Sequence, residues 1–130
     1  MGIVYAPLRL ANDARSDLEE MDFNALVDTG ALHLCIPAHV AIQLQLTQRG
    51  QREIKTADGR LHLIPYMSPV RIAMLGRQCV TGALVLGDQV LLGAIPLEDM
   101  DLIVEPATLR VRTNPASPNV PMSFAMGLHR

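Results

Sequence analysis

An aspartate at the end of an apolar segment is the feature of this 130-residue sequence that could carry chemistry. The run from Ala25 to Ala31 contains the triplet Asp28-Thr29-Gly30, so the acid follows aliphatic residues and a glycine closes a tight turn. A carboxyl group held in such a turn can act as a general acid or base. The same triplet can also be a purely structural turn, in which the Asp28 side chain accepts a hydrogen bond from nearby backbone. The triplet alone leaves both interpretations open.

Three further segments accompany the triplet in order: Leu32–Ile36 followed by Pro37, a hairpin at Asp58-Gly59, and Leu91-Leu92-Gly93. Together they make the sequence resemble the retroviral-type (retropepsin-like) aspartic proteases, and in particular their bacterial single-domain relatives. The resemblance extends from Ile3 to Thr113. It implies an aspartic endopeptidase that hydrolyses peptide bonds of extended polypeptides without a cofactor.

The resemblance makes a demand on quaternary structure, because these enzymes use two carboxylates that share one proton. This chain carries one such motif, so the second must come from another copy. We therefore expect a homodimer with its two-fold axis between Asp28 and Asp28 of the partner subunit. Viral enzymes also have an ion pair between an Arg after the second hallmark glycine and an Asp soon after the triplet. Ala94 and Leu32-His33 stand at those places, so the dimer is expected to be held differently.

The resemblance also assigns roles within the site. One Asp28 acts as general base on a water while the other polarises the scissile carbonyl. Thr29 is expected to hydrogen-bond across the axis, and Gly30 to let the backbone approach the substrate. Ala31 cannot donate the hydrogen bond to the carboxylate that a Ser could, which predicts an activity optimum in mildly acidic solution.

Two further groups of residues are assigned to substrate binding and support. A flap that binds substrate and closes over it is expected at Thr56, Ala57, Asp58 and Gly59; the alternative is an ordinary surface hairpin. Packing beneath the catalytic loop is expected from Leu91, Leu92 and Gly93.

Composition argues against several other classes of protein. Eleven basic residues against 13 acidic ones, with two Tyr, two Phe and no Trp, offer little for binding or stacking a nucleic acid. The longest stretch without charged residues, Ala31–Gln48, contains Pro, His and Gln, which argues against a membrane span. The N-terminus has the pattern neither of a signal peptide nor of a myristoylation site, so we expect a cytoplasmic protein.

Cysteines and histidines give no clear metal or disulfide pattern. Cys35 and Cys79 lie in apolar segments and are interpreted as reduced core thiols. His33, His39 and His62 lack the spacing of a zinc site, and there is no Cys-x-x-Cys motif, so no metal is expected.

The elements that must position these residues are mostly strands, because short aliphatic runs are broken repeatedly by Gly, Pro and Asp. We expect a single-lobe acid-protease β-barrel with one or two short helices, within a domain of residues 1–113 followed by a Pro-rich tail, 114–130. A two-residue turn is expected at Asp58-Gly59. The expected strands are 3–10, 21–27, 32–36, 51–57, 60–64, 70–75, 79–86, 89–92, 102–104 and 109–112, and the expected helices are 38–46 and a short one from Pro96.

Two other functions fit the same residues. The fold could serve as a non-catalytic dimerisation or peptide-binding module, since a fold does not by itself give a function. The chain could also be a monomeric β domain in which Asp28 is only a turn residue.

Overall fold

The computed structural model describes residues 2–125. Alternation of buried and exposed residues explains its first two strands: in β1 the side chains of Val4, Ala6, Leu8 and Leu10 are buried and those between them are exposed. The elements are β1 (Val4–Asn12), β2 (Met21–Val27), β3 (Leu34–Ile36), α1 (Ala38–Gln43), β4 (Thr47–Lys55), β5 (Leu61–Met74), β6 (Arg77–Val85), β7 (Leu91–Leu92), α2 (Ala94–Asp99), β8 (Leu102–Glu105) and β9 (Arg110–Thr113).

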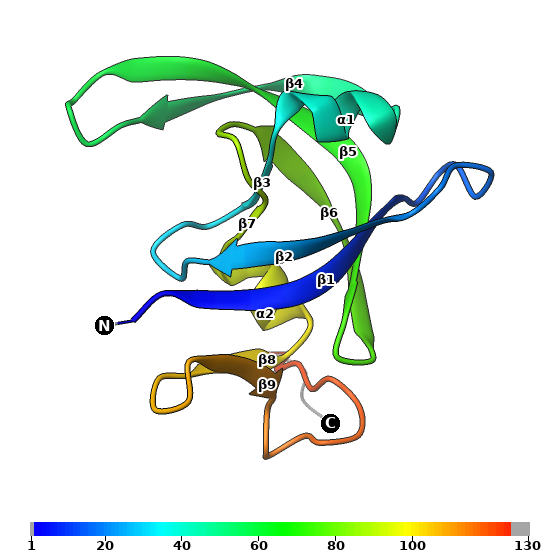
Figure 1. The fold of residues 1–130 in the computed structure, drawn as a ribbon, viewed down its shortest axis with the longest axis vertical. Coiled ribbons are helices and arrows are strands. Elements are labelled where there is room, and N and C mark those ends of the chain that lie inside the picture. Colours follow the sequence, from blue (N-terminus) through cyan, green and yellow to red (C-terminus); the bar gives the residue numbers. More distant parts are fainter. Residues whose placement is uncertain (1, 126–130) are drawn as a thin grey trace.

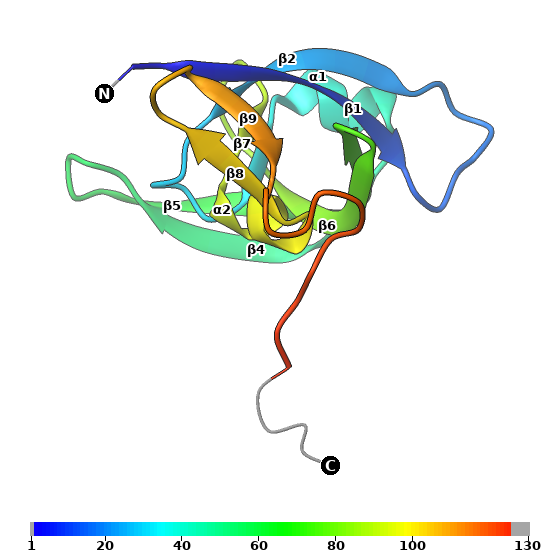
Figure 2. The ribbon, with the colours of Figure 1, turned by 90° about the horizontal axis from the view of Figure 1, so that it is seen from below.

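The strands close into a barrel. Their order is β1-β2-β7-β3-β6-β5, and β5 returns to β1 through the pairs from Arg9↔Ala73 to Asn12↔Val70. β4 continues the sheet beyond β5, and the β4–β5 hairpin projects from the barrel (Figure 1). The smaller β8–β9 sheet lies across one end of the barrel (Figure 2). The expected mostly-β barrel with two short helices is confirmed.

The barrel interior holds the apolar core that fixes this arrangement. Alternate residues of β1 face inward, all three residues of β3 are buried, and both helices add buried apolar side chains. The largest fully buried side chains include Leu10, Leu34, Ile36, Leu44, Ile72, Leu92 and Met100. Within the described part of the chain, neither six-residue helix has the length and apolar character needed to cross a membrane.

Several expected boundaries are wrong for identifiable reasons. The strands expected at 60–64 and 70–75 are one continuous strand, β5, because a register shift between Met67 and Val70 accommodates Pro69. The helix expected to reach Leu46 ends at Gln43, since Gln45 adopts a left-handed conformation (φ 51°).

The turn of the β4–β5 hairpin also differs from the expectation. Thr56 N–H donates to Arg60 O (3.0 Å) and Gly59 N–H donates to Thr56 O (2.9 Å), which makes a loop of three residues between Thr56 and Arg60. Gly59 has a positive φ (84°) but Asp58 does not, so the expected two-residue turn is wrong. A turn followed by a left-handed glycine is the usual form of a three-residue hairpin loop.

The segment after β9 is fastened to the barrel by Asp101. Its carboxylate accepts hydrogen bonds from Asn114 Nδ2 (3.0 Å), Ser117 Oγ and Met122 N (2.9 Å). The buried Arg77 donates to Asp101 O (2.8 Å) and to Ser117 O, which secures the same segment from β6. The described part of the expected tail is therefore attached as far as Met122, and its residues 126–130 lie outside the described residues.

Candidate active site

The Asp28 turn is held in place by the end of β7. β2 and β7 run parallel, with Leu26 paired to Leu91 and Val27 to Leu92. One residue beyond β2, Asp28 N–H donates to Leu92 O at 3.0 Å. The aspartate therefore leaves the sheet at a fixed position, with its side chain exposed.

One carboxylate oxygen of Asp28 is fixed by the turn itself. Gly30 N–H donates to Asp28 Oδ1 at 2.9 Å, and Ala31 N–H donates to Asp28 O at 3.1 Å. The bond from Gly30 N–H to the Asp28 side chain is the one expected of a structural Asp turn. Among the described residues Oδ2 has no hydrogen-bond partner, so the turn orients the carboxylate and leaves an oxygen free for a proton, a water or a second carboxyl group.

Gly93 lies against the backbone of the loop that carries Asp28. A Cβ atom at Gly93 would lie 2.5 Å from His33 O, 2.6 Å from Leu32 C and 2.8 Å from Ala31 O. The φ of Gly93 is −92°, so the glycine is needed for this close approach and not for an unusual conformation. Beyond it, Ala94 N–H donates to Ala31 O (2.8 Å) and Ile95 N–H donates to Leu32 O (2.9 Å). The start of α2 and the Asp28 loop are thus a single packed unit.

Thr29 is exposed at the same turn and borders an apolar cavity of about 490 Å³. Ala94, Leu97 and Val104 also line this cavity. Within the described residues the Thr29 side chain donates no hydrogen bond, so its expected hydrogen bond across a two-fold axis stays a prediction.

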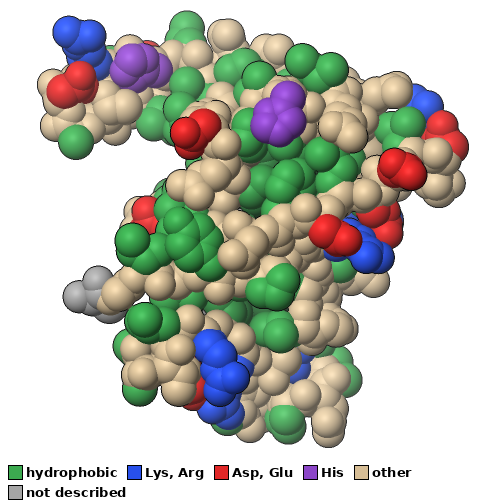
Figure 3. All heavy atoms as spheres, viewed as in Figure 1, with side chains coloured by type: hydrophobic (Ala, Val, Ile, Leu, Met, Phe, Trp, Pro, Cys, Tyr) green, Lys and Arg blue, Asp and Glu red, His purple; other side chains and the backbone are tan. Residues whose placement is uncertain are grey.

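The residues expected in the flap lie at the tip of the β4–β5 hairpin. Asp58 Oδ1 accepts hydrogen bonds from Thr56 Oγ1 (2.5 Å) and from Arg60 N–H (3.1 Å), which stiffens the tip. These bonds hold the pKa of Asp58 below its usual value. In Figures 1 and 2 the hairpin projects on the same side as the loop after β2, and Figure 3 shows the surface hollowed beneath it. Its function as a flap stays a prediction.

Two residues that the sequence analysis missed connect this hairpin to the loop after Asp28. The Arg52 guanidinium of β4 lies 4.3 Å from the centre of the Tyr66 ring of β5. His33 meets the same ring edge-on, with centroids 6.1 Å apart. Burial, and secondly the Arg52 charge, lowers the pKa of His33. Arg52 and Tyr66 are brought together by the register of β4 against β5, which cannot be read from the order of residues along the chain.

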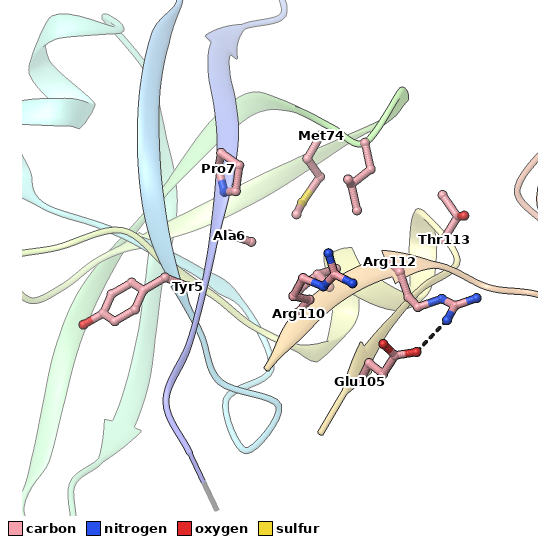
Figure 4. Close-up of a pocket in the computed structure, with 10 residues that line it drawn as sticks. Tyr5, Ala6, Pro7, Met74, Glu105, Arg110, Arg112 and Thr113 are labelled. Carbon is pink, nitrogen blue, oxygen red and sulfur yellow. Dashed lines mark hydrogen bonds and ion pairs between the residues drawn. The ribbon is translucent and has the colours of Figure 1, made fainter. Parts of the chain in front are cut away.

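The site is separate from the cavity shown in Figure 4. That cavity of about 550 Å³ lies between β1, the β5–β6 turn and β9, and it contains none of the residues expected to act in catalysis. A Glu105–Arg112 ion pair (2.6 Å) lies at its edge.

Cys35 and Cys79 are buried free thiols, as expected of core cysteines. Burial raises the pKa of both, that of Cys79 to about 12, and the Asp28 charge contributes to the shift at Cys35. Within residues 2–125, no three His, Cys, Asp or Glu side chains lie together in a way that could bind a metal ion.

Comparison with solved structures identifies the fold. No protein-family model and no curated protein sequence matches the chain. The protease of EIAV in complex with the inhibitor HBY-793 is 24% identical over 75% of this chain and 88% of its own, with a TM-score of 0.59. The retroviral protease-like domain of Ddi1 from Leishmania major is 15% identical over 98% of this chain and 99% of its own, with a TM-score of 0.60. This chain therefore has the retropepsin-like fold, as its sequence motifs had indicated.

Proposed function

We propose that the protein is a cytoplasmic aspartic endopeptidase that acts as a homodimer, with Asp28 and Asp28 of the partner subunit forming the catalytic pair. One carboxylate is ionised and takes a proton from a water held between the two. The other is protonated, polarises the scissile carbonyl and later passes a proton towards the leaving nitrogen. Such a pair titrates as a unit, because two like charges at short distance cannot both ionise easily.

The observation that carries this proposal is the presentation of Asp28 in a retropepsin-like fold. Its carboxylate is exposed, Gly30 N–H fixes one oxygen, and Leu92 O fixes the backbone at 3.0 Å. A catalytic carboxylate needs this kind of preorganisation, since orienting a mobile group would add to the activation barrier.

The surface beside Asp28 supports a second copy as the partner. Leu32 and Ile95 are joined by a backbone hydrogen bond, and their side chains are 59% and 43% exposed. The apolar cavity bordered by Thr29 is also lined by Ala94, the residue before Ile95. Burial of this surface by a second chain would hold the dimer by apolar contact in place of the viral Arg–Asp pair, and it would bring the second Asp28 to the first.

The β4–β5 hairpin supports a peptide as the substrate. A hydrogen-bonded tip above a hollow surface is formed by Thr56, Ala57, Asp58 and Gly59. Within residues 2–125, β4 pairs with β5 alone and has one free edge. We assign this hairpin as the flap, which closes over an extended polypeptide and excludes water from the reaction.

The test compares peptide cleavage with oligomeric state. The wild-type protein is incubated with a peptide library in mildly acidic and neutral solution, and its mass is measured by sedimentation. Asp28→Asn is expected to lower kcat at least about a hundredfold, because it removes the general base, while the dimer persists. Asp88→Asn, at an exposed aspartate of another turn, serves as the matched control and is expected to retain activity.

The proposal is wrong if the dimeric wild-type protein cleaves no peptide, or if Asp28→Asn cleaves as well as the wild type. Dimeric protein that binds peptides without cleaving them would instead identify a peptide-binding module. A protein that stays monomeric at all concentrations would leave Asp28 as a turn residue.

A further inference from the structure

Arg52, Tyr66 and His33 form a cluster between the hairpin and the Asp28 loop that the proposed reaction does not use. Arg52 lies over one face of the Tyr66 ring, and His33 meets the ring edge. Because His33 belongs to the loop after Asp28 and Arg52 to the hairpin strand β4, the cluster lies between the two parts of the proposed substrate site.

The strand register explains why this arrangement is possible. Arg52 pairs with Ile64 and Gly50 pairs with Tyr66, so Arg52 and Tyr66 are on the same face of the β4–β5 hairpin. A Cβ at Gly50 would meet no atom within 4 Å, so the β4 side of the ring is open. On the opposite side, a Cβ at Gly82 of β6 would lie 2.1 Å from the Tyr66 ring. Gly82 therefore leaves room for the ring, and the ring lies beneath the guanidinium.

No salt bridge to Arg52 is formed by the residues that the structure describes. Several other arginines, among them Arg9 and Arg71, have carboxylates within 3.5 Å. Arg52 has no carboxylate within 4 Å among the described residues. A guanidinium over an aromatic ring can still direct the N–H donors of its own plane outward, where they can bind a carboxylate through two parallel hydrogen bonds.

We propose that Arg52, supported by Tyr66, is a specificity-determining residue that binds an acidic side chain of the peptide substrate. The proposal rests on the proposed endopeptidase function and adds the substrate class to it: extended peptides with Glu or Asp at one defined position relative to the cleaved bond. His33 borders the same position from the Asp28 loop and can contribute a ring N–H.

The test uses a set of peptides that differ only by Glu or Gln, scanned through each position around one cleaved bond. The wild-type protein is expected to show a KM about fivefold lower for Glu at one position, the range that an exposed ion pair allows. Arg52→Gln is expected to abolish this preference, so that the KM values for the Glu and Gln peptides become equal. Arg49→Gln, which removes the same charge from the same strand, is expected to retain the preference.

The position dependence separates a binding site from a general electrostatic effect. A Glu preference spread evenly over all positions, or one that persists in Arg52→Gln, overturns the proposal. If the wild-type protein cleaves nothing, the endopeptidase function fails instead. Binding of the same Glu and Gln peptides to the wild-type protein and to Arg52→Gln, measured by fluorescence anisotropy, then decides whether acidic recognition stands: loss of Glu preference in the variant supports it, and equal binding refutes it.

Discussion

Replacing Gly93 by alanine is expected to damage the fold and the site together. The added Cβ would lie 2.5, 2.6 and 2.8 Å from backbone atoms of His33, Leu32 and Ala31, and backbone cannot turn aside as a side chain can. Overpacking of this kind typically costs 1–3 kcal/mol, and contact with three backbone atoms places this case at about 3 kcal/mol. For 130 residues, with an unfolding entropy near 2.1 cal/mol/K per residue, the melting temperature should fall by about 10 °C.

The measurement is thermal unfolding by circular dichroism at one fixed protein concentration, because dimerisation would make Tm depend on concentration. Gly76→Ala is the matched control: its φ is +75° and no atom lies within 4 Å of the added Cβ. It should cost only the left-handed conformation, about 1 kcal/mol or about 4 °C. Gly93→Ala should also lose peptide cleavage beyond its loss of stability, since the loop it displaces carries Asp28. If Gly93→Ala melts within about 2 °C of the wild type, the close approach of Gly93 to the loop is not rigid and the reasoning is refuted.

Three further predictions concern a core leucine, the carboxylate of Asp101 and the two buried thiols. Leu92→Ala should lower the free energy of unfolding by about 2–5 kcal/mol in urea titrations, because Leu92 is fully buried, and a value below about 1 kcal/mol would contradict its place in the core. Hydrogen bonds from Ser117, Asn114 and Met122 lower the pKa of Asp101 to about 2. The ionised Asp101 carboxylate therefore contributes fully to the free energy of unfolding above about pH 4, and this contribution is lost as the pH falls towards 2. Asp101→Asn should be less stable than the wild type at pH 6, and the difference should shrink at pH 2.5. Burial raises the pKa of the Cys35 and Cys79 thiols, so a disulfide reagent at pH 8 should modify them slowly in native protein and rapidly in urea.

The parts of the fold that the sequence predicted best are those in which each residue's environment is set by its neighbours along the chain. The strand Met21–Val27 has the expected bounds, because its alternation of apolar and polar residues matches one buried and one exposed face. The Asp28 turn and the Leu91-Leu92-Gly93 segment were recognised as motifs, and the structure brings them into contact.

The parts that escaped prediction depend on residues distant in sequence. We expected separate strands at 60–64 and 70–75, but pairing with β4, β6 and β1 keeps β5 continuous and places Pro69 at the register shift. Arg52 and Tyr66 meet through register and through the space at Gly82. The anchoring of the segment after β9 depends in the same way on Asp101, whose partners come from later in the chain.

The position of β4 outside the closed barrel has a consequence for solubility. A strand that pairs on one side presents a row of free N–H and C=O groups, which invites edge-to-edge association with other chains. In the described part of the chain β4 pairs with β5 alone, and a hairpin that acts as the proposed flap would have to keep this edge accessible. Its sequence limits the risk: Arg49, Arg52, Glu53 and Lys55 place charges along it, and the register shift at Gly50 interrupts a straight ladder. The same charged edge that would receive a substrate therefore also discourages the growth of an aggregate.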